Sequence, residues 1–400
     1  MTSEIKQRIQ QIGCGEVPEG YVKTALGLAP ADWKRYTFGD IYTERKEPGS
    51  EELPLLMVSI HSGVSDGEVD EAELPKKVKR IEDKSQYKKA VSGDLVFNMM
   101  RAWQGAIGTV RTTGMVSPAY IVAEPNDKVY PLFMDYYTRT PQMINQIDRQ
   151  SYGVTDFRKR LYWDSFAPIG CILPPIEEQR KIAAILATQD KVIDLKEKHL
   201  AGKERQKKYL MQQLLTGKKR LPGFAFEVEK TNIKAISTYS VSTISQTTLE
   251  SYEGKQLYPV FNANSIAGYV DFYENECPYI SIIKDGAGIG RVRLCEAKSS
   301  TIGTMGCIHA RKGISIIFLY YLLEQVDFNK YSNGSTIPHL YYKDYSCEKV
   351  RIPNIKEQSA IAEVLSAADR EIELLKQDIE QEKQKKKALM QLLLTGIVRI

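Results

Sequence analysis

Apolar residues recur in alternating steps of four and three over two long stretches of the chain, 174–217 and 353–396. This spacing is the heptad pattern of a coiled-coil seam, in which one stripe of each helix faces a partner helix. No proline interrupts either stretch after its first turn, and Gly217 and Gly396 stand where a helix commonly ends. We therefore expect each stretch to form one α-helix, about 60 Å long at a rise of about 1.5 Å per residue.

The two stretches are copies of one another. Each residue of the second copy lies 179 positions after its counterpart, as Gln358 does after Gln179, and 19 of the 44 aligned positions are identical. Chance does not produce such a match, so the chain contains a duplicated unit. Glu177, Glu178 and Glu357 lie near the helix starts, where the helix dipole favours anions.

The seams of both copies contain polar positions, so helices of this length require a partner, and the obvious partner of each copy is the other. We expect the two helices to pair antiparallel as a coiled coil. The alternative, two long surface helices without a partner, is less consistent with the repeat. The apolar residues predicted to pair the helices are Ile182, Leu186, Ile193, Leu200, Leu210, Leu214, Ile361, Leu365, Ile372, Leu375, Ile379, Leu389 and Leu393.

Outside the helices the pattern changes to short β-rich runs separated by turns, which predicts two globular α/β domains and an α+β fold for the chain. The first domain should contain strands at 53–60, 95–100, 107–110 and 119–123 and a helix at 132–146; the second should contain strands at 257–262 and 279–283 and a helix at 318–325. The resulting segments are an N-terminal segment (1–24), a first domain (25–173), a central helix (174–217), a second domain (218–352) and a distal helix (353–400).

Composition places the chain among soluble proteins. Of its 400 residues, 42% are hydrophobic and 26% are charged, and no apolar run approaches the roughly 20 residues of a membrane span. The first residues lack the apolar core of a signal peptide, so we expect a cytoplasmic protein that does not bind a membrane. A net charge of +5 permits nucleic-acid binding without requiring it.

Motifs for catalysis and for cofactor or metal binding are missing from the sequence. The glycine turn at 286–290 lacks the last glycine of a dinucleotide-binding motif, and no phosphate-binding loop with Gly-Lys-Ser/Thr occurs. The six cysteines contain no Cys-x-x-Cys pair, and His61, His199, His309 and His339 share no metal-ligand spacing. Glu82-Asp83-Lys84 resembles part of a nuclease motif, but such triplets are usually solvated surface. Together these observations favour a binding protein over an enzyme.

Several motifs together resemble one known family. They are the run at 93–108, the run Val116-Ser117-Pro118-Ala119-Tyr120, the glycine turn at 285–290, the Pro-x-x-Glu-Gln-x-x-Ile-Ala helix starts and the Leu-Leu-Thr-Gly helix ends. In this layout, which covers nearly the whole chain, the protein resembles the specificity subunits of type I restriction-modification systems. In that family two target-recognition domains alternate with two conserved helices.

The resemblance implies a non-catalytic subunit without a cofactor of its own. It implies double-stranded DNA as a ligand, two modification subunits that carry S-adenosylmethionine and methylate adenine, and restriction subunits that use ATP and Mg. The fold it implies is two target-recognition domains joined by two long helices in an antiparallel coiled coil, with an internal pseudo-two-fold repeat. Because such a repeat inverts one domain relative to the other, the two half-sites should be read in opposite orientation, about one helical turn of DNA or more apart. Because the two domains differ, the half-sites should differ in sequence and the target should be asymmetric.

The candidate DNA-contacting residues are polar or aromatic and lie in the loops of the two domains, where side chains could reach bases or phosphates. Arg101 and Gln104 flank Trp103 and could instead support a turn, and Tyr152 could be a packing residue. The candidates are Arg101, Gln104, Tyr152, Thr155, Arg158 and Lys159 in the first domain and Lys284, Arg291, Asn333, Ser335, Thr336 and His339 in the second.

Two other functional classes remain open at this stage. One is a coiled-coil scaffold or adaptor with two ligand-binding domains and no DNA role. The other is an enzyme, such as a fused methyltransferase with unrecognised motifs. DNA binding that is sensitive to salt and specific for one bipartite sequence would distinguish the predicted function from both.

Overall fold

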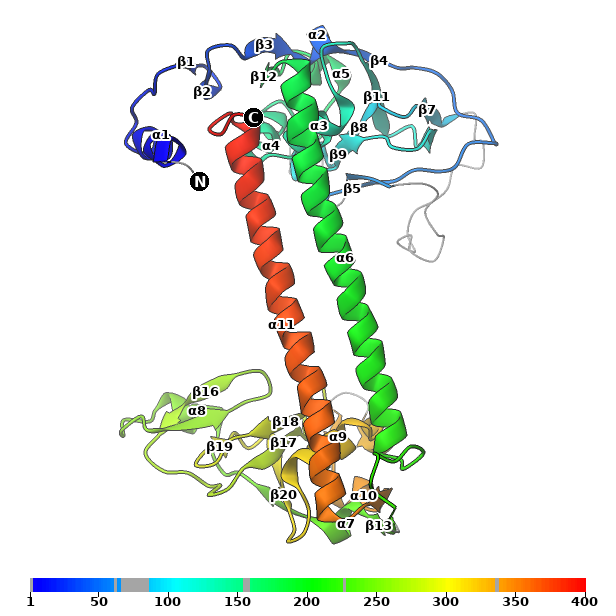
Figure 1. The fold of residues 1–400 in the computed structure, drawn as a ribbon, viewed down its shortest axis with the longest axis vertical. Coiled ribbons are helices and arrows are strands. Elements are labelled where there is room, and N and C mark those ends of the chain that lie inside the picture. The colour runs from blue at the N-terminus through cyan, green and yellow to red at the C-terminus, as the bar shows by residue number, and fades with distance from the viewer. Residues whose placement is uncertain (1–2, 61–62, 66–85, 154–158, 226–227, 335–337) are drawn as a thin grey trace. The chain divides into compact units, whose positions relative to one another are not determined.

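The computed structural model describes residues 3–60, 63–65, 86–153, 159–225, 228–334 and 338–400. The chain divides into two compact units, which we call unit 1 (Met1–Leu195 with Ile379–Ile400) and unit 2 (Lys196–Asp378). Each unit therefore contains one globular domain together with about half of each long helix (Figure 1). The boundaries between the units fall within the long helices, whereas the five segments proposed from the sequence treat each helix as a segment of its own. The boundaries of those segments stay a prediction.

The two long helices are α6 (Ile176–Leu214) and α11 (Ile355–Leu394), as the heptad pattern predicted. Gly217 and Gly396 follow them with φ angles of 68° and 72°, in the left-handed region that only glycine adopts without strain. In unit 2 the ion pairs Lys196–Asp378, Lys203–Glu371 and Lys207–Asp369 join rising residue numbers in α6 to falling numbers in α11. The pair is therefore antiparallel, as expected.

The predicted seam residues face the interior of their units. Burial is complete or nearly so for Ile182, Leu186, Ile193, Leu214, Ile361, Leu365, Ile372, Ile379 and Leu393. The other four are half-buried: Leu200, Leu210, Leu375 and Leu389. The apolar seam thus contributes directly to the cores of the two units, because Leu186 and Leu393 belong to the core of unit 1 and Leu214 and Leu365 belong to that of unit 2.

Polar seam positions are matched across the helix pair. Gln189 donates to the Glu382 carboxylate at 2.6 Å, and ion pairs connect the remaining polar positions. These ion pairs are Lys386–Asp190 (2.5 Å) in unit 1 and Lys196–Asp378 (2.8 Å), Lys203–Glu371 (2.6 Å) and Lys207–Asp369 (2.7 Å) in unit 2. Such pairs allow only the register that brings their partners together.

Unit 1 is built around a four-stranded antiparallel sheet in the order β4-β11-β8-β9, which is covered by α3 and α4 (Figure 1). Its described elements before α6 are α1 (Ser3–Gly13), β1 (Tyr21–Thr24), β2 (Gly27–Pro30), β3 (Lys34–Thr37), α2 (Phe38–Ile41), β4 (Tyr42–Glu44), β5 (Val58–Ser59), β6 (Gly63–Val64), β7 (Lys88–Ala90), β8 (Leu95–Asn98), η3 (Ala102–Gln104), β9 (Ile107–Thr109), β10 (Gly114–Val116), β11 (Tyr120–Pro125), α3 (Pro131–Tyr137), α4 (Pro141–Arg149), α5 (Trp163–Phe166) and β12 (Gly170–Leu173).

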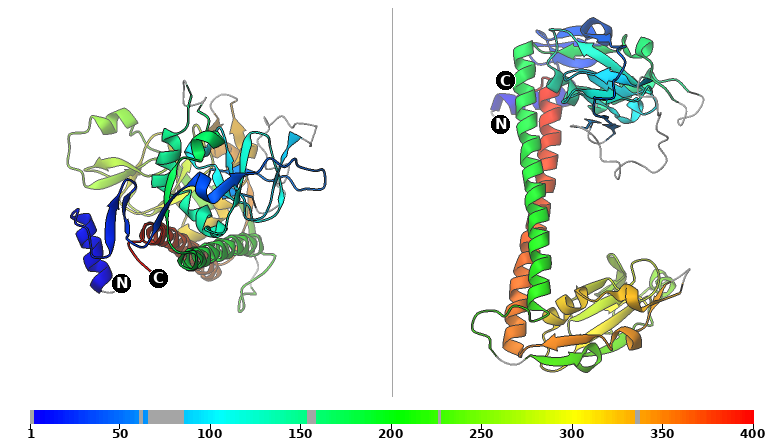
Figure 2. Two further views of the ribbon diagram at one scale, coloured as in Figure 1. Left: turned by 90° about the horizontal axis from the view of Figure 1, so that it is seen from above. Right: turned by 90° about the vertical axis from the view of Figure 1, so that its right-hand side faces the viewer.

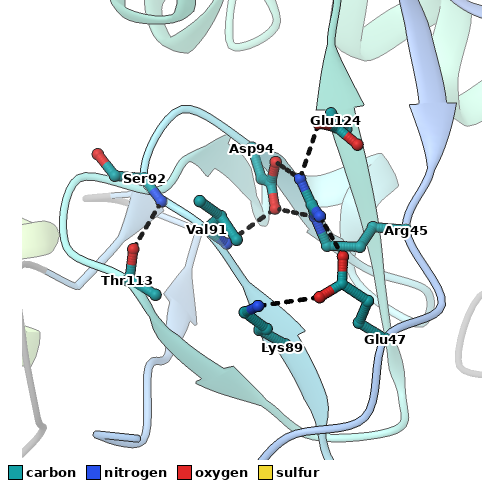
Figure 3. Close-up of polar contacts among 8 residues, drawn as sticks. All are labelled: Arg45, Glu47, Lys89, Val91, Ser92, Asp94, Thr113 and Glu124. Carbon is teal, nitrogen blue, oxygen red and sulfur yellow. Dashed lines mark hydrogen bonds and ion pairs between the residues drawn. The ribbon is translucent and has the colours of Figure 1, made fainter.

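A buried carboxylate anchors the edge of this sheet. Asp94, in the turn before β8, is 1% exposed, accepts from the Val91 backbone N–H and forms a bidentate pair with Arg45, which follows β4 (Figure 3). Arg45 also contacts Glu47 and Glu124, so one guanidinium joins three carboxylates from different parts of unit 1. The aspartate of this turn is therefore a structural residue.

Unit 2 repeats this arrangement with a sheet in the order β14-β20-β17-β18. Its described elements are β13 (Glu229–Asn232), α7 (Ile233–Ile236), β14 (Ser237–Val241), α8 (Gln246–Glu250), β15 (Tyr258–Phe261), β16 (Ile266–Val270), β17 (Tyr279–Ile283), β18 (Val292–Cys295), β19 (Ser300–Thr301), β20 (Met305–Ala310), α9 (Ile316–Glu324), η5 (Phe328–Tyr331), β21 (Ser332–Asn333), β22 (His339–Leu340), α10 (Tyr342–Tyr345) and β23 (Lys349–Ile352).

The same two-stranded ribbon introduces and ends each domain. β3 pairs with β12 in unit 1, and β13 pairs with β23 in unit 2; each leads directly into the following long helix. The duplication recognised in the helices therefore extends through the globular domains.

Glutamine and arginine side chains hold the start of each long helix in equivalent ways. Gln179 accepts from the Tyr130 backbone N–H and donates to the Pro174 carbonyl, while Gln358 makes the corresponding bonds to Ser315 and Pro353. Glu178 and Glu357 lie near the helix starts, where the helix dipole was expected to favour their negative charge. Both are buried and form bidentate pairs with arginines. The partners are Arg399 and Arg220 respectively, again 179 positions apart.

Two predicted elements differ from the structure. The strand expected at 53–60 is reduced to β5, because Pro54 lacks the N–H that a strand interior needs, and Leu55 forms only a single bridge to Met115. The helix expected at 132–146 is two helices, α3 and α4, because Pro141 starts a new helix capped by Thr140.

The two ends of the chain lie together in unit 1 (Figure 2). Arg8 of α1 donates to the Ile397 carbonyl at 3.1 Å, and the Tyr21 hydroxyl donates to the Gly396 carbonyl at 2.6 Å. Arg399, at the end of the chain, bridges Asp32 and Glu178. The last residues of the sequence are therefore part of the first unit.

Replacement of Arg399 by alanine should destabilise unit 1 by about 2 kcal/mol, because the nearly buried carboxylate of Glu178 loses its charged partner. Urea unfolding followed by tryptophan fluorescence reports on this unit alone, since Trp33, Trp103 and Trp163 all belong to it. Lys46→Ala removes an exposed ion pair in the same unit and should cost less than about 0.5 kcal/mol. Equal midpoints for the two variants would contradict the structural role of Arg399.

Candidate nucleic-acid interface

Two loops meet in unit 1 at the place where most candidate residues lie. The first is the turn between β8 and β9, which contains η3, and the second is the hairpin closed by a bridge between Tyr152 and Arg160. The Leu161 N–H donates to the Met99 carbonyl at 2.8 Å and joins the two loops. Residues far apart in the sequence are thereby brought to one edge of the sheet.

Arg101 and Gln104 are exposed at the two ends of η3. The Trp103 indole between them donates to the Met100 carbonyl at 3.0 Å, and Gly105 ends the turn with a φ of 104°. Trp103 therefore supports the turn, while the two flanking side chains extend into solvent. They are available to contact a ligand.

Lys159 and Tyr152 come from the second loop and have partners within the unit. The Lys159 ammonium lies 2.8 Å from the Asp148 carboxylate and 5.0 Å from the centre of the Trp103 ring. Tyr152 is 59% exposed, and its hydroxyl accepts from Ser165 at 2.7 Å. The two residues lie next to the first loop, so four of the six candidates of unit 1 are brought together.

Unit 2 presents an equivalent pair of loops. The turn between β17 and β18 contains Gly286, Gly288 and Gly290, all with positive φ, and the hairpin of β21 and β22 lies beside it. The Leu340 N–H donates to the Lys284 carbonyl at 2.8 Å. Leu340 lies 179 positions after Leu161, so the same hydrogen bond joins the two loops in both units.

Asp285 organises the charged groups of this site. Its carboxylate lies 2.6 Å from the Lys284 ammonium and 2.7 Å from His339 Nδ1. Burial by itself raises the pKa of Asp285, but the hydrogen bonds from Lys284 and His339 outweigh it and leave that pKa below its ordinary value. Asp285 is thus ionised at neutral pH and joins candidates from both loops.

Arg291 and Asn333 lie further along the two loops of unit 2. The Arg291 guanidinium donates to the Ala263 carbonyl at 2.9 Å and to the Asn264 side chain at 2.6 Å. Asn333 is exposed and donates to the Asp344 carboxylate at 3.3 Å. Arg291 therefore also connects the glycine turn to the segment after β15.

Four predicted residues, Thr155, Arg158, Ser335 and Thr336, lie outside the described residues.

The common hydrogen bonds of Leu161 and Leu340 align residues 331–339 of unit 2 with residues 152–160 of unit 1. With this register Arg160 and His339 occupy the same place.

Sequence reasoning missed two exposed tyrosines beside these loops. Tyr162 and Tyr341 are 47% and 50% exposed and lie directly before α5 and α10. The Tyr341 ring stacks on His339, with 6.5 Å between the ring centres and an angle of 25°, and the Lys343 ammonium lies 5.5 Å from it. The missed signal is the 179-residue offset, which relates the two tyrosines just as it relates the helices.

The arrangement is suited to binding rather than to catalysis. Each unit presents arginine, lysine, amide and aromatic side chains on two adjoining loops above a rigid sheet. Among the ranges that the structure describes, no group of histidine, cysteine and carboxylate side chains could hold a metal ion. Within those ranges the helices also lack the combination of length and apolar character needed to cross a membrane.

Comparisons with known proteins give one consistent result. Residues 226–384 match the model of the type I restriction modification DNA specificity domain. The putative type I restriction enzyme MjaX specificity subunit of Methanocaldococcus jannaschii is 24% identical over 96% of this chain and 97% of its own length. The MjaVIII specificity subunit of the same organism is 22% identical over 93% of this chain and 94% of its own length.

The fold has equivalents among solved structures. The S subunit of a type I restriction-modification system from M. genitalium superimposes with a TM-score of 0.59 and 14% identity, over 90% of this chain and 96% of that one. A second structure, from work on complex assembly and conformational transition of the type I R-M system, gives a TM-score of 0.56 and 17% identity, over 92% and 99%. The family model over residues 226–384, the two relatives along nearly the whole chain and the fold all relate this protein to the specificity subunits of type I restriction-modification systems.

Proposed function

We propose that the protein reads a bipartite double-stranded DNA target, with one half-site for each pair of loops. The observation that supports this most directly is the duplicated hydrogen bond of Leu161 and Leu340, which presents unlike side chains on equivalent loops. Arg160 of unit 1 and His339 of unit 2 occupy equivalent positions. The glycine turn of unit 2 contains no glutamine that could correspond to Gln104. Loops that carry different side chains on equivalent sheets would recognise different half-sites, so the target is asymmetric.

The chemistry of the loops suits the two kinds of contact that DNA requires. Exposed Gln104 has an amide that can pair bidentately with adenine in the major groove, and Arg101 can pair with guanine or neutralise a phosphate. In unit 2, Lys284, Asn333 and His339 offer donors of the same kinds. Tyr162 and Tyr341 add aromatic surface beside these groups. Thr155, Arg158, Ser335 and Thr336 remain candidates from the sequence alone.

As a specificity subunit the chain is non-catalytic, and it would deliver chemistry through its partners. We expect two modification subunits, which bind S-adenosylmethionine and methylate adenine, and restriction subunits that use ATP and Mg. The paired helices would serve both as a docking surface for the modification subunits and as a ruler between the half-sites. Binding to cellular DNA implies a cytoplasmic location. A coiled-coil scaffold without DNA recognition is less consistent with the relatives named above.

A map of methylated adenines in cells that express this chain with its modification subunit tests the proposal as a whole. We expect methylation at one asymmetric bipartite sequence, with two half-sites separated by a spacer of constant length. Cells that express the modification subunit alone provide the control and should lack this methylation. Methylation that follows no bipartite sequence would contradict the proposed function.

Gln104→Ala should relax base discrimination in one half-site only, because Gln104 lies in the loops of unit 1. Loss of one bidentate base contact costs about 1–3 kcal/mol of discrimination. Competition binding by the assembled complex, with DNA mutated in either half-site, measures this. Gln10→Ala, which changes an exposed glutamine of α1 in the same unit, is the control. Equal loss of discrimination at both half-sites would contradict the assignment of one reader to each unit.

A heptad inserted into both α6 and α11, between Leu195 and Lys196 and between Asp378 and Ile379, keeps the seam in phase and lengthens each helix by about 10 Å. If the helices are the ruler, the methylation map should show a spacer longer by about three base pairs at 3.4 Å each, or no modification, with no change of either half-site. An unaltered spacer with full modification would show that the helices do not set the distance.

A further inference from the structure

Unit 2 contains a cationic cavity that plays no part in the proposed DNA reading. The cavity has a volume of about 410 Å³ and lies between the end of α6, η5 and β23. Its lining includes four cationic residues, namely Lys218, Lys330, Lys349 and Arg351. It includes only two acidic residues, Asp327 and Glu348. Glu348 already accepts a hydrogen bond from the Tyr331 hydroxyl. The cavity therefore carries an excess of positive charge.

The adjoining ribbon strengthens this charge. Lys230 of β13 stands directly opposite Arg351 of β23, and both side chains are exposed. Like charges placed opposite one another on a sheet are destabilising, so the arrangement costs stability unless an anion lies over it. Lys349, two residues before Arg351 on β23, projects from the same face of the ribbon.

The equivalent place in unit 1 has the opposite character. Ile172, the counterpart of Arg351, is 8% exposed, and Trp33 and Ala29 pack on it. Ile397 stands in the place of Lys218. Here the cavity is smaller, about 230 Å³, and residues of the chain's own N-terminal segment, among them Ile12 and Tyr21, form part of its lining. In unit 1, the N-terminal segment of the chain therefore covers the equivalent site.

The lining of the cavity in unit 2 also favours a peptide. Below its charged rim lie apolar side chains, namely Leu215, Leu322, Val326 and Val350. A DNA backbone has phosphates for the rim but nothing apolar for the floor, whereas a peptide can provide an apolar anchor flanked by carboxylates. Arginine pairs bidentately with carboxylates, and Arg351 uses one of its donors on the Thr216 carbonyl and keeps others for such a contact.

We propose that this cavity binds an acidic segment with an apolar anchor that belongs to the modification subunit. The segment occupies in unit 2 the place that the N-terminal segment of the chain occupies in unit 1. Lys218, Lys349 and Arg351 pair with its carboxylates, and the apolar floor receives its anchor. This inference rests on the proposed function, because it assumes the modification subunit as partner, and it adds a docking site on the globular part of unit 2.

The test measures the affinity of the purified modification subunit for the full-length chain by calorimetry at two salt concentrations. Lys218→Glu together with Lys349→Glu should weaken binding about tenfold or more and reduce its salt dependence, because attraction becomes repulsion at the rim. The neutral pair Lys218→Gln and Lys349→Gln should have a smaller effect in the same direction. Lys255→Glu with Lys312→Glu, exposed residues of the same unit, makes the same charge change and should leave the affinity unaltered.

Three results would overturn the inference. One is an unaltered affinity in the charge-reversed variant. Another is an equal loss in the control pair, which would indicate a general effect of net charge. The third is a loss of affinity for DNA with unaltered affinity for the modification subunit, which would make DNA phosphate the occupant. A methylation map that still shows the bipartite target in any of these cases leaves the proposed function standing, so the two failures are distinguishable.

Discussion

Each globular unit is completed by the end of the long helix that belongs to the other repeat. Leu393 and Leu394 of α11 lie in the core of unit 1, and Leu214 and Leu215 of α6 lie in the core of unit 2. Burial of each such side chain contributes about 1.5–3 kcal/mol, which is a large part of the net stability of a domain. Neither globular domain can therefore bury its core without the end of a long helix, and in unit 1 that segment comes from more than 200 residues after the domain's last strand.

Polar contacts then select one register for the helix pair. In unit 1, Asp190 accepts from the Tyr136 hydroxyl at 2.7 Å and pairs with Lys386. Unit 2 repeats this triad, since Asp369 accepts from the Tyr321 hydroxyl at 2.7 Å and pairs with Lys207. An apolar seam alone tolerates a slip by a heptad, whereas a half-buried ion pair held by a third element does not. Each triad joins both long helices to the domain, so the helix register and the position of the sheet are set together.

The sequence predicted what depends on local periodicity. The heptads located both long helices within two or three residues, and the terminal glycines were assigned correctly because a left-handed residue there has a local cause. Contacts between distant segments were not predictable in this way. Nothing local indicates that Arg399 pairs with Glu178, or that Asp285 joins Lys284 to His339, because both depend on how the chain folds back. The candidate loops were found by residue type, but their meeting through Leu161 and Leu340 needed the structure.

The internal repeat provides a comparison that a single fold lacks. Where both units keep the same side chain in the same contact, as Gln179 and Gln358 do at the helix starts, the residue supports the frame. Where an equivalent place changes from buried and apolar to exposed and charged, as from Ile172 to Arg351, the frame does not require the change. An exposed arginine opposite a lysine costs stability and adds nothing to the core. We infer that such a residue contacts a ligand.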